Sequence, residues 1–157
     1  MEGVLLSVHV LAAIVFVGGS AVAASLFPRY APVAVSVPAG DAAAPEQPAG
    51  ERNRAVAVAL HRVTRVYGVL GLVVPVVGIV LAMVQGRMGE IWINISMVLT
   101  VLAGALLALA VAPMQRDALA APDDGGQLRR LGMLAGIYNL LWAAVVVLMI
   151  VRPGGHS

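Results

Sequence analysis

The sequence predicts an all-α protein, a four-transmembrane-helix up-down bundle in which residues 1–157 form a single domain. Two observations predict this fold. First, 61% of the 157 residues are hydrophobic and only 11% are charged, whereas a soluble domain is about 45–50% apolar and about 25% charged. Second, the charged residues leave four long uncharged stretches. A helix needs about 20 apolar residues to cross a hydrocarbon core about 30 Å thick, so each stretch is long enough to cross once.

The four predicted spans are helices because a backbone in lipid has to satisfy its own hydrogen bonds. They cover about residues 3–27, 66–86, 91–113 and 131–151. We expect the first span to be retained rather than cleaved, because Glu2 stands where a signal peptide carries positive charges.

The connections between the spans differ in composition. Residues 28–50 hold five of the nine prolines, which predicts an irregular linker. Proline and glycine are absent from residues 51–65, so we expect one long helix from Glu51 to Val84, kinked at Pro75. Residues 85–90 are expected to form a tight turn.

The arginines predict the orientation in the membrane. Lysine is absent, and eight of the ten arginines lie in the loops 28–65 and 114–130. Under the positive-inside rule both loops are cytoplasmic and both termini lie outside. The arginine-rich, lysine-free composition suggests a bacterium, so the predicted location is a bacterial cytoplasmic (inner) membrane, with membrane lipids as the surroundings.

The residue inventory excludes several kinds of chemistry. The chain has no cysteine, hence no disulfide, thiolate metal site or iron–sulfur cluster. It contains none of the nucleotide-binding, metalloprotease or Ser/His/Asp patterns, and its arginines are explained by orientation rather than by nucleic-acid binding. No acidic residue falls within a span, which disfavours a proton-driven transporter.

His9 is the strongest candidate for a functional side chain, because polar groups inside a membrane are costly. It is a candidate ligand for a metal or haem, and copper or haem b would suit a cluster with outer methionines. The alternative is a hydrogen bond to Asn94, Ser96 or a carbonyl of a neighbouring helix. The candidate methionines are Met97 and Met149, with Met83 and Met88 on the same side.

Glycines at helical spacing are candidates for helix packing. Small residues let two membrane helices approach closely, either inside the bundle or against another subunit or a second copy. The pattern is formed by Gly18, Gly19, Gly132 and Gly136.

Residues 9–19, HVLAAIVFVGG, join an early histidine to an aromatic residue and a glycine pair. This segment resembles the first helix of the four-helix bacterial membrane family related to the copper-resistance CopD domain. The order His9 followed by Phe27, Pro28 and Arg29 is similar to HemJ-type haem-binding membrane proteins. Residues 61–82 also resemble the second CopD-like helix. The resemblance implies that His9 is a cofactor ligand. Phe16 stands where the family usually has tryptophan, and no other histidine falls in a span, so a multi-histidine copper site is unsupported.

Two functions therefore remain open. The first is a non-catalytic accessory or stabilising subunit of a larger bacterial membrane complex, of which a respiratory complex is one example. The second is a haem- or copper-binding membrane protein of the CopD/HemJ-like type that uses His9.

Overall fold

The computed structural model describes residues 2–34 and 52–154, and within these residues it contains helices and no β-strand. The first helical stretch consists of α1 (Glu2–Ala12), the π-helical segment η1 (Ala13–Val17) and α2 (Gly18–Tyr30). The second consists of α3 (Arg54–Leu70) and α4 (Val73–Val84). The third consists of α5 (Ile91–Leu106), η2 (Leu107–Val111) and α6 (Ala112–Ala120), and the fourth is α7 (Gly126–Val151).

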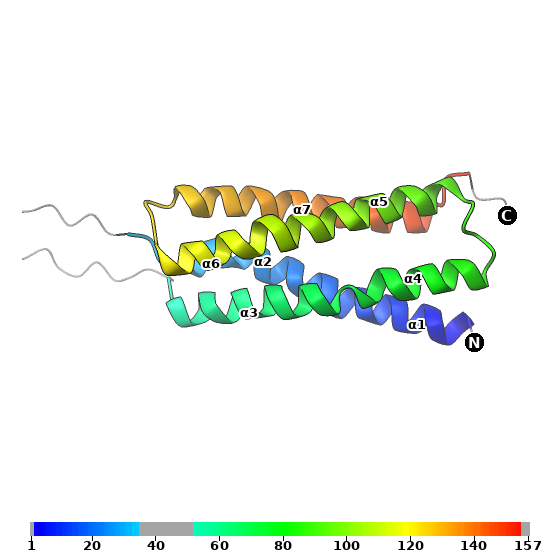
Figure 1. Ribbon diagram of the computed structural model, residues 1–157, viewed down its shortest axis with the longest axis horizontal. Helices are drawn as coiled ribbons and strands as arrows, with labels where there is room; N and C mark the ends of the chain where they lie inside the picture. The colour runs from blue at the N-terminus through cyan, green and yellow to red at the C-terminus, as the bar shows by residue number, and fades with distance from the viewer. Residues whose placement is uncertain (1, 35–51, 155–157) are drawn as a thin grey trace, which may run out of the picture.

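Each helical stretch is long and apolar enough to cross a membrane. The four stretches are Glu2–Tyr30, Arg54–Val84, Ile91–Ala120 and Gly126–Val151. They run side by side in alternating directions (Figure 1). The predicted all-α bundle of four spanning helices is therefore confirmed, and the chain has the architecture of a multi-pass membrane protein.

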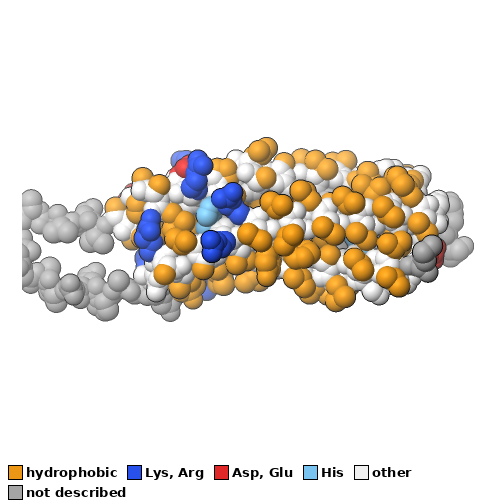
Figure 2. Space-filling view, turned by 60° about the horizontal axis from the view of Figure 1, so that its bottom comes forward, with side chains coloured by type: hydrophobic (Ala, Val, Ile, Leu, Met, Phe, Trp, Pro, Cys, Tyr) orange, Lys and Arg blue, Asp and Glu red, His pale blue; other side chains and the backbone are white. Residues whose placement is uncertain are grey.

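The two ends of the bundle differ in charge. One end, called here the arginine-rich end, contains the close of α2, the start of α3, the close of α6 and the start of α7. Figure 2 shows arginines gathered near this end on one face, whereas hydrophobic side chains cover the rest of that face. The other end, the termini end, contains the N-terminus of α1 and the C-terminus of α7 (Figure 1).

The helices pack tightly towards the arginine-rich end. There α2 packs against α3 and α7, and α3 packs against α6. The core of this half contains the fully buried side chains Phe27, Val111 and Leu131. Small buried residues such as Ala57 and Ala103 bring the backbones close together.

Towards the termini end the bundle divides into two helix pairs. The first pair is α1 with α4, and the second is α5 with α7. A smaller apolar cluster joins the close of α4 to the second pair and contains Ala82, Trp92 and Ile93, with Met88, Met97 and Met149 packed against it.

Three of the four helical stretches are irregular near the middle. The first and third contain the π-helical segments η1 and η2, and the second is interrupted by a turn at residues 71–72. Pro75 explains this interruption, because proline lacks an N–H and its ring clashes with the carbonyl four residues earlier, which here belongs to Gly71. The break predicted from Pro75 is thus present, one turn before the proline.

Two predicted boundaries shift. Helix α2 continues through Pro28 to Tyr30, so the expectation of an irregular linker from residue 28 was wrong for its first residues; residues 35–50 lie outside the described part. The second helical stretch begins at Arg54 rather than Glu51, because the Asn53 side chain caps it. Its Oδ1 accepts hydrogen bonds from the backbone N–H groups of Ala55 and Val56.

Candidate functional site

His9 is directed from α1 towards α4 and is 8% exposed. Its Nδ1 lies 3.0 Å from the carbonyl oxygen of Val74. A carbonyl can only accept, so Nδ1 donates, and in the neutral imidazole Nε2 then keeps a free lone pair. The sequence left three hydrogen-bonding partners open for His9, and in the structure its partner is the carbonyl of a neighbouring helix. Asn94 instead donates to the carbonyl of Glu90, and the buried Ser96 hydroxyl has no partner among the described residues.

Gly78 makes room for the His9 ring. A Cβ atom at position 78 would lie 2.9 Å from Cε1 of His9 and 3.3 Å from its Nδ1. With a Cβ at these distances, the ring or α4 would have to shift. The imidazole therefore occupies the volume that any larger residue at position 78 would fill.

The candidate methionines lie on other helices. Met97 on α5 and Met149 on α7 pack with Met88 against the cluster of Ala82, Trp92 and Ile93. Helix α5 packs mainly against α7, whereas α1, which carries His9, packs mainly against α4. The structure thus brings the two methionines to one cluster and packs His9 of α1 against α4. Among the described residues there is no group of three or more His, Cys, Asp or Glu side chains suited to a metal ion.

The four candidate packing glycines divide into two kinds. Gly19 packs inside the bundle, because a Cβ there would overlap the Tyr67 ring of α3. A Cβ at Gly18, Gly132 or Gly136 would meet nothing within 4 Å. Gly132 and Gly136 are exposed on the outer face of α7, so they serve no packing contact within the described chain.

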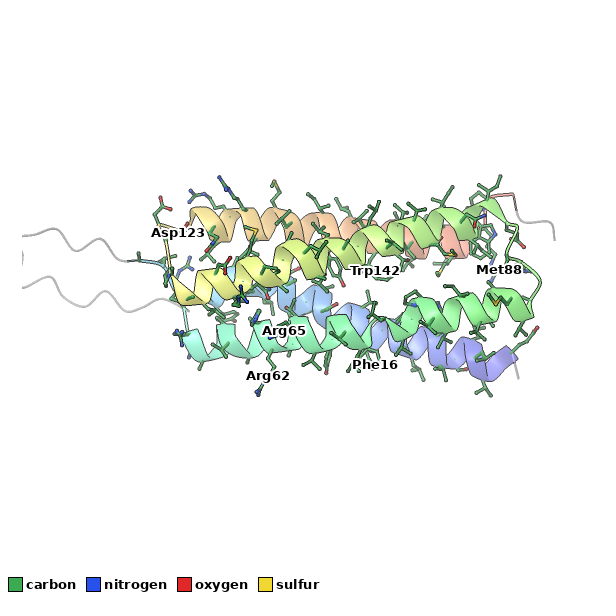
Figure 3. All side chains as sticks on the ribbon, in the orientation of Figure 1. Phe16, Arg62, Arg65, Met88, Asp123 and Trp142 are labelled. Atoms are coloured by element: carbon green, nitrogen blue, oxygen red, sulfur yellow. The ribbon has the colours of Figure 1, made fainter. Side chains whose placement is uncertain are left out.

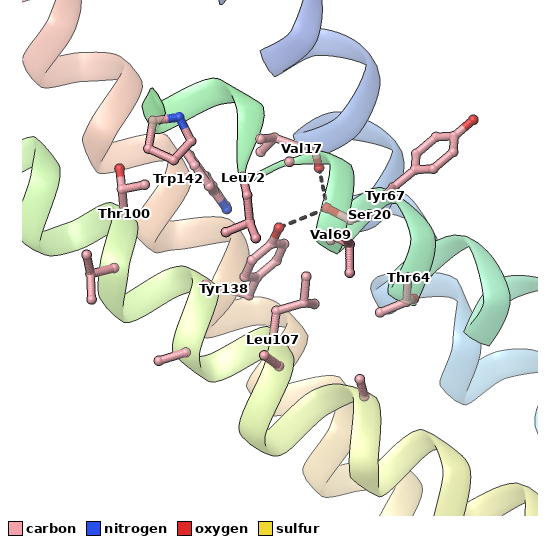
Figure 4. Close-up of a pocket in the computed structure, with 18 of the residues that line it drawn as sticks. Val17, Ser20, Thr64, Tyr67, Val69, Leu72, Thr100, Leu107, Tyr138 and Trp142 are labelled. Carbon is pink, nitrogen blue, oxygen red and sulfur yellow. Dashed lines mark hydrogen bonds between the residues drawn. The ribbon is translucent and has the colours of Figure 1, made fainter. Parts of the chain in front are cut away.

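A cavity of about 710 Å³ lies between the two helix pairs, at the level of the three helix irregularities. Figure 4 shows side chains from α2, α3, α5 and α7 around it. Most of the lining is apolar, and Val17, Leu72, Leu107 and Met97 are examples. A cavity of this size is within the range of ligand-binding sites.

Polar side chains are present on one part of the cavity wall. The Ser20 hydroxyl donates to the carbonyl of Val17 (2.9 Å), so at 2.8 Å it accepts a hydrogen bond from the Tyr138 hydroxyl (Figure 4). The buried Nε1–H of Trp142 has no hydrogen-bond partner among the described residues, and its indole stands edge-on to the Tyr138 ring. A bound molecule with an acceptor atom would supply the hydrogen bond that this indole N–H lacks.

Arg65 is the charged residue among the described side chains that line the cavity. It is exposed and follows the fully buried Thr64 on α3. Arg62 lies one turn earlier and projects outward from α3 (Figure 3). The cavity therefore carries a positive charge towards the arginine-rich end.

The sequence interpretation overlooked Gln115, which is 0% exposed and links α3 to α6. Its Oε1 lies 3.1 Å from Nδ1 of His61, and its Nε2 lies 3.4 Å from the Thr64 hydroxyl. The amide oxygen accepts from His61, so the amide nitrogen is free to donate to Thr64. The available signal was the spacing of His61 and Thr64, which places both on one helix face.

Outside the cavity, Asn139 of α7 donates to the Ser25 hydroxyl of α2 at 2.9 Å. Its Oδ1 is buried and has no partner among the described residues. Asn139 follows Gly132 and Gly136 at helical spacing, seven and three residues later, so the three residues share one side of α7.

A comparison of the chain with protein-family models, with curated proteins and with solved structures finds no match.

Proposed function

We propose that this chain is a small non-catalytic accessory subunit of a larger bacterial membrane complex, held to a partner through the outer face of α7. The observation that carries the proposal is the open space at Gly132 and Gly136. Two glycines one turn apart on an exposed helix face allow a second membrane helix to approach the backbone closely. A helix interior otherwise disfavours glycine by about 1 kcal/mol relative to alanine, and no contact within the described chain offsets that cost.

The accessory-subunit proposal is tested by substituting the glycines. Gly136→Leu and Gly132→Leu place a branched side chain on the proposed contact face, whereas Ala144→Leu does so at another exposed position of α7. We expect the two glycine variants to fold, to lose the partner protein that co-purifies with the wild type, and to keep the cavity intact. Retention of the partner by the glycine variants, or its loss in Ala144→Leu, would refute the proposed face. Co-purification of a second copy alone would refute the accessory role.

The proposal also includes the orientation of the bundle in the membrane. We place the arginine-rich end in the cytoplasm and both termini outside, following the arginine bias. The absence of cysteine allows single-cysteine variants without a background. On intact cells a membrane-impermeant thiol reagent should label Gln85→Cys and spare Ala121→Cys. The opposite pattern would reverse the orientation.

A second candidate, a haem- or copper-binding protein, is supported by the hydrogen bond of His9. Ligating histidines commonly donate their other ring N–H to a carbonyl, which orients the ring. His9 donates through Nδ1 to Val74 and keeps Nε2 free, so it fits the role of one ligand. When bound, a haem would supply electron-transfer chemistry. The candidate requires that the purified wild type carries haem absorption or copper and that His9→Ala loses it, whereas His61→Ala keeps it. Wild-type protein without either cofactor would exclude this candidate.

A further inference from the structure

We propose that the cavity between the two helix pairs binds one anionic phospholipid, with an acyl chain between the pairs and the phosphate against Arg65. This site is separate from the outer face of α7, so the two proposals can fail independently. The proposal depends on the dimensions of the cavity, on the distribution of its polar groups and on its charge.

The cavity has the shape of a long apolar slot. Its lining extends from Thr64 to Ile79 on the second helical stretch and from Ile93 to Ala112 on the third. With a helical rise of about 1.5 Å per residue these spans are about 23 Å and about 29 Å long. A hydrocarbon core is about 30 Å thick, so the slot extends past the membrane midplane from the arginine-rich end. An elongated apolar chain fits this length, whereas a compact ligand would leave part of it unfilled.

The polarity of the lining changes along the slot. Ser20, Thr64 and Tyr138 lie near the level of Arg65, because Gly19 contacts Tyr67 and Ser20 bonds Tyr138. Trp142 is one turn further along α7. Beyond this level, apart from Thr100, the lining is apolar and includes Pro75, Ile79, Ile93 and Met97. This order of positive charge, then hydroxyl and N–H groups, then apolar side chains complements the phosphate, the ester oxygens and the acyl chains of a glycerophospholipid.

The charge at the polar end selects an anionic headgroup. The described lining contains Arg65 as its charged residue and no Asp or Glu. The described ion pairs, Arg87 with Glu90 and Arg116 with Asp117, do not involve Arg65. A guanidinium binds a phosphate through two parallel N–H donors. Basic residues near a membrane surface gain about 1 kcal/mol each from anionic lipids, equivalent to about a fivefold preference.

The test uses the full chain, delipidated in a neutral detergent, and two lipids with the same acyl chains, phosphatidylglycerol and phosphatidylcholine. Native mass spectrometry counts the bound lipid over a lipid titration. We expect one tightly retained phosphatidylglycerol, bound about fivefold more tightly than phosphatidylcholine. Arg65→Gln should remove this preference, whereas Arg62→Gln, which removes the same charge one turn away, should keep it.

A second variant tests the position of the acyl chain. Gly104 lines the cavity, and a Cβ there would meet nothing within 4 Å, so Gly104→Leu should fill the slot and lower the binding of both lipids. Ala144→Leu, which adds one carbon fewer, is the control for an added branched side chain outside the cavity. If Gly104→Leu does not fold, the proposal is tested by the lipid preference of Arg65→Gln compared with that of Arg62→Gln.

Three results would overturn the proposal. The first is equal binding of the two lipids by the wild type. The second is unchanged lipid binding by a folded Gly104→Leu variant. The third is co-purification of a neutral lipophile that phosphatidylglycerol does not displace. Loss of lipid preference in Arg65→Gln with the partner protein still bound would support the lipid site without bearing on the accessory role.

Discussion

The His9 imidazole fills the space that the absent side chain of Gly78 leaves on α4. A Cβ at position 78 would lie 2.9 Å from Cε1 of His9, and Nδ1 of the same ring lies 3.0 Å from the carbonyl oxygen of Val74, one turn earlier on α4. The contact fixes the ring against α4 and holds α1 to α4, the helix that contributes Pro75, Gly78 and Ile79 to the cavity wall.

Gly78→Ala should therefore destabilise the bundle. Overpacking costs about 1–3 kcal/mol, and the gain from replacing a helical glycine by alanine is about 1 kcal/mol, so we expect a net loss of up to about 2 kcal/mol in the free energy of unfolding. In a His9→Ala background the overpacking disappears, and Gly78→Ala should become stabilising. Denaturant unfolding in detergent measures all four proteins. The same sign in both backgrounds would show that Gly78 does not accommodate the ring.

Two adjacent glycines should respond in opposite directions. Gly19→Ala places a methyl group in the Tyr67 ring and, after the helix-propensity gain of about 1 kcal/mol is subtracted, should lower the unfolding free energy by up to about 2 kcal/mol. Gly18→Ala meets nothing within 4 Å and should raise it by up to about 1 kcal/mol. Thermal unfolding of the two variants side by side makes the comparison. Equal effects would contradict the assignment of Gly19, and not Gly18, to the contact between α2 and α3.

Replacing the buried Gln115 should lower the free energy of unfolding more than replacing its exposed neighbour Arg116. Gln115→Leu keeps most of the side-chain volume but leaves His61 and the fully buried Thr64 without their partner, which costs about 1–3 kcal/mol. Arg116→Ala, at an exposed site, should change stability by about 0.5 kcal/mol or less. Chemical denaturation of both variants measures the difference. An unchanged free energy of unfolding in Gln115→Leu would mean that the hydrogen bonds of Gln115 with His61 and Thr64 contribute no net stability.

Asp123 should make the stability of the arginine-rich end depend on pH. Its carboxylate accepts hydrogen bonds from the backbone N–H groups of Gln127 and Gly125 at the start of α7. These bonds, the one from Gln127 foremost, and the nearby positive charge of Arg129 lower the pKa of Asp123 below its usual 3.8. A lowered pKa in the folded state means that the stabilisation is complete above about pH 4 and is lost as the pH falls through the folded pKa.

The pH prediction is measured with Asp123→Asn, which keeps an acceptor oxygen but removes the charge. The melting temperature of the wild type should exceed that of the variant at pH 6, and the difference should shrink as the pH falls below 3.8. A difference that stays constant from pH 6 to pH 3 would show that the Asp123 charge does not stabilise the folded state.

The sequence was sufficient for the number and approximate position of the spanning helices, because charge is excluded from lipid and the gaps between charges are therefore visible. It was insufficient at helix ends. Pro28 was expected to end the first helix, yet the structure continues the helix to Tyr30. Proline lacks an N–H donor and crowds the carbonyl four residues earlier, yet at Pro28 the helix continues, with Phe27 packed in the core.

Side-chain partners were less predictable than helices. His9 was recognised as unusual, but its acceptor is a main-chain carbonyl of Val74, and every residue offers a carbonyl. Gly18 and Gly19 look equivalent in sequence, although they are rotated about 100° apart around the helix and only Gly19 contacts Tyr67. The cavity is lined in part by residues of η1, η2 and the turn at residues 71–72, and of these segments only the turn has a sequence signal, Pro75.

The most direct test of the accessory role is native mass spectrometry of the protein extracted gently from its own membranes. The proposal predicts that the wild type retains at least one different protein subunit, that Gly136→Leu releases this subunit, and that Ala144→Leu retains it. A wild-type chain that emerges without any other protein subunit would contradict the accessory role, and an added haem or copper mass on that lone chain would make His9 the functional residue instead.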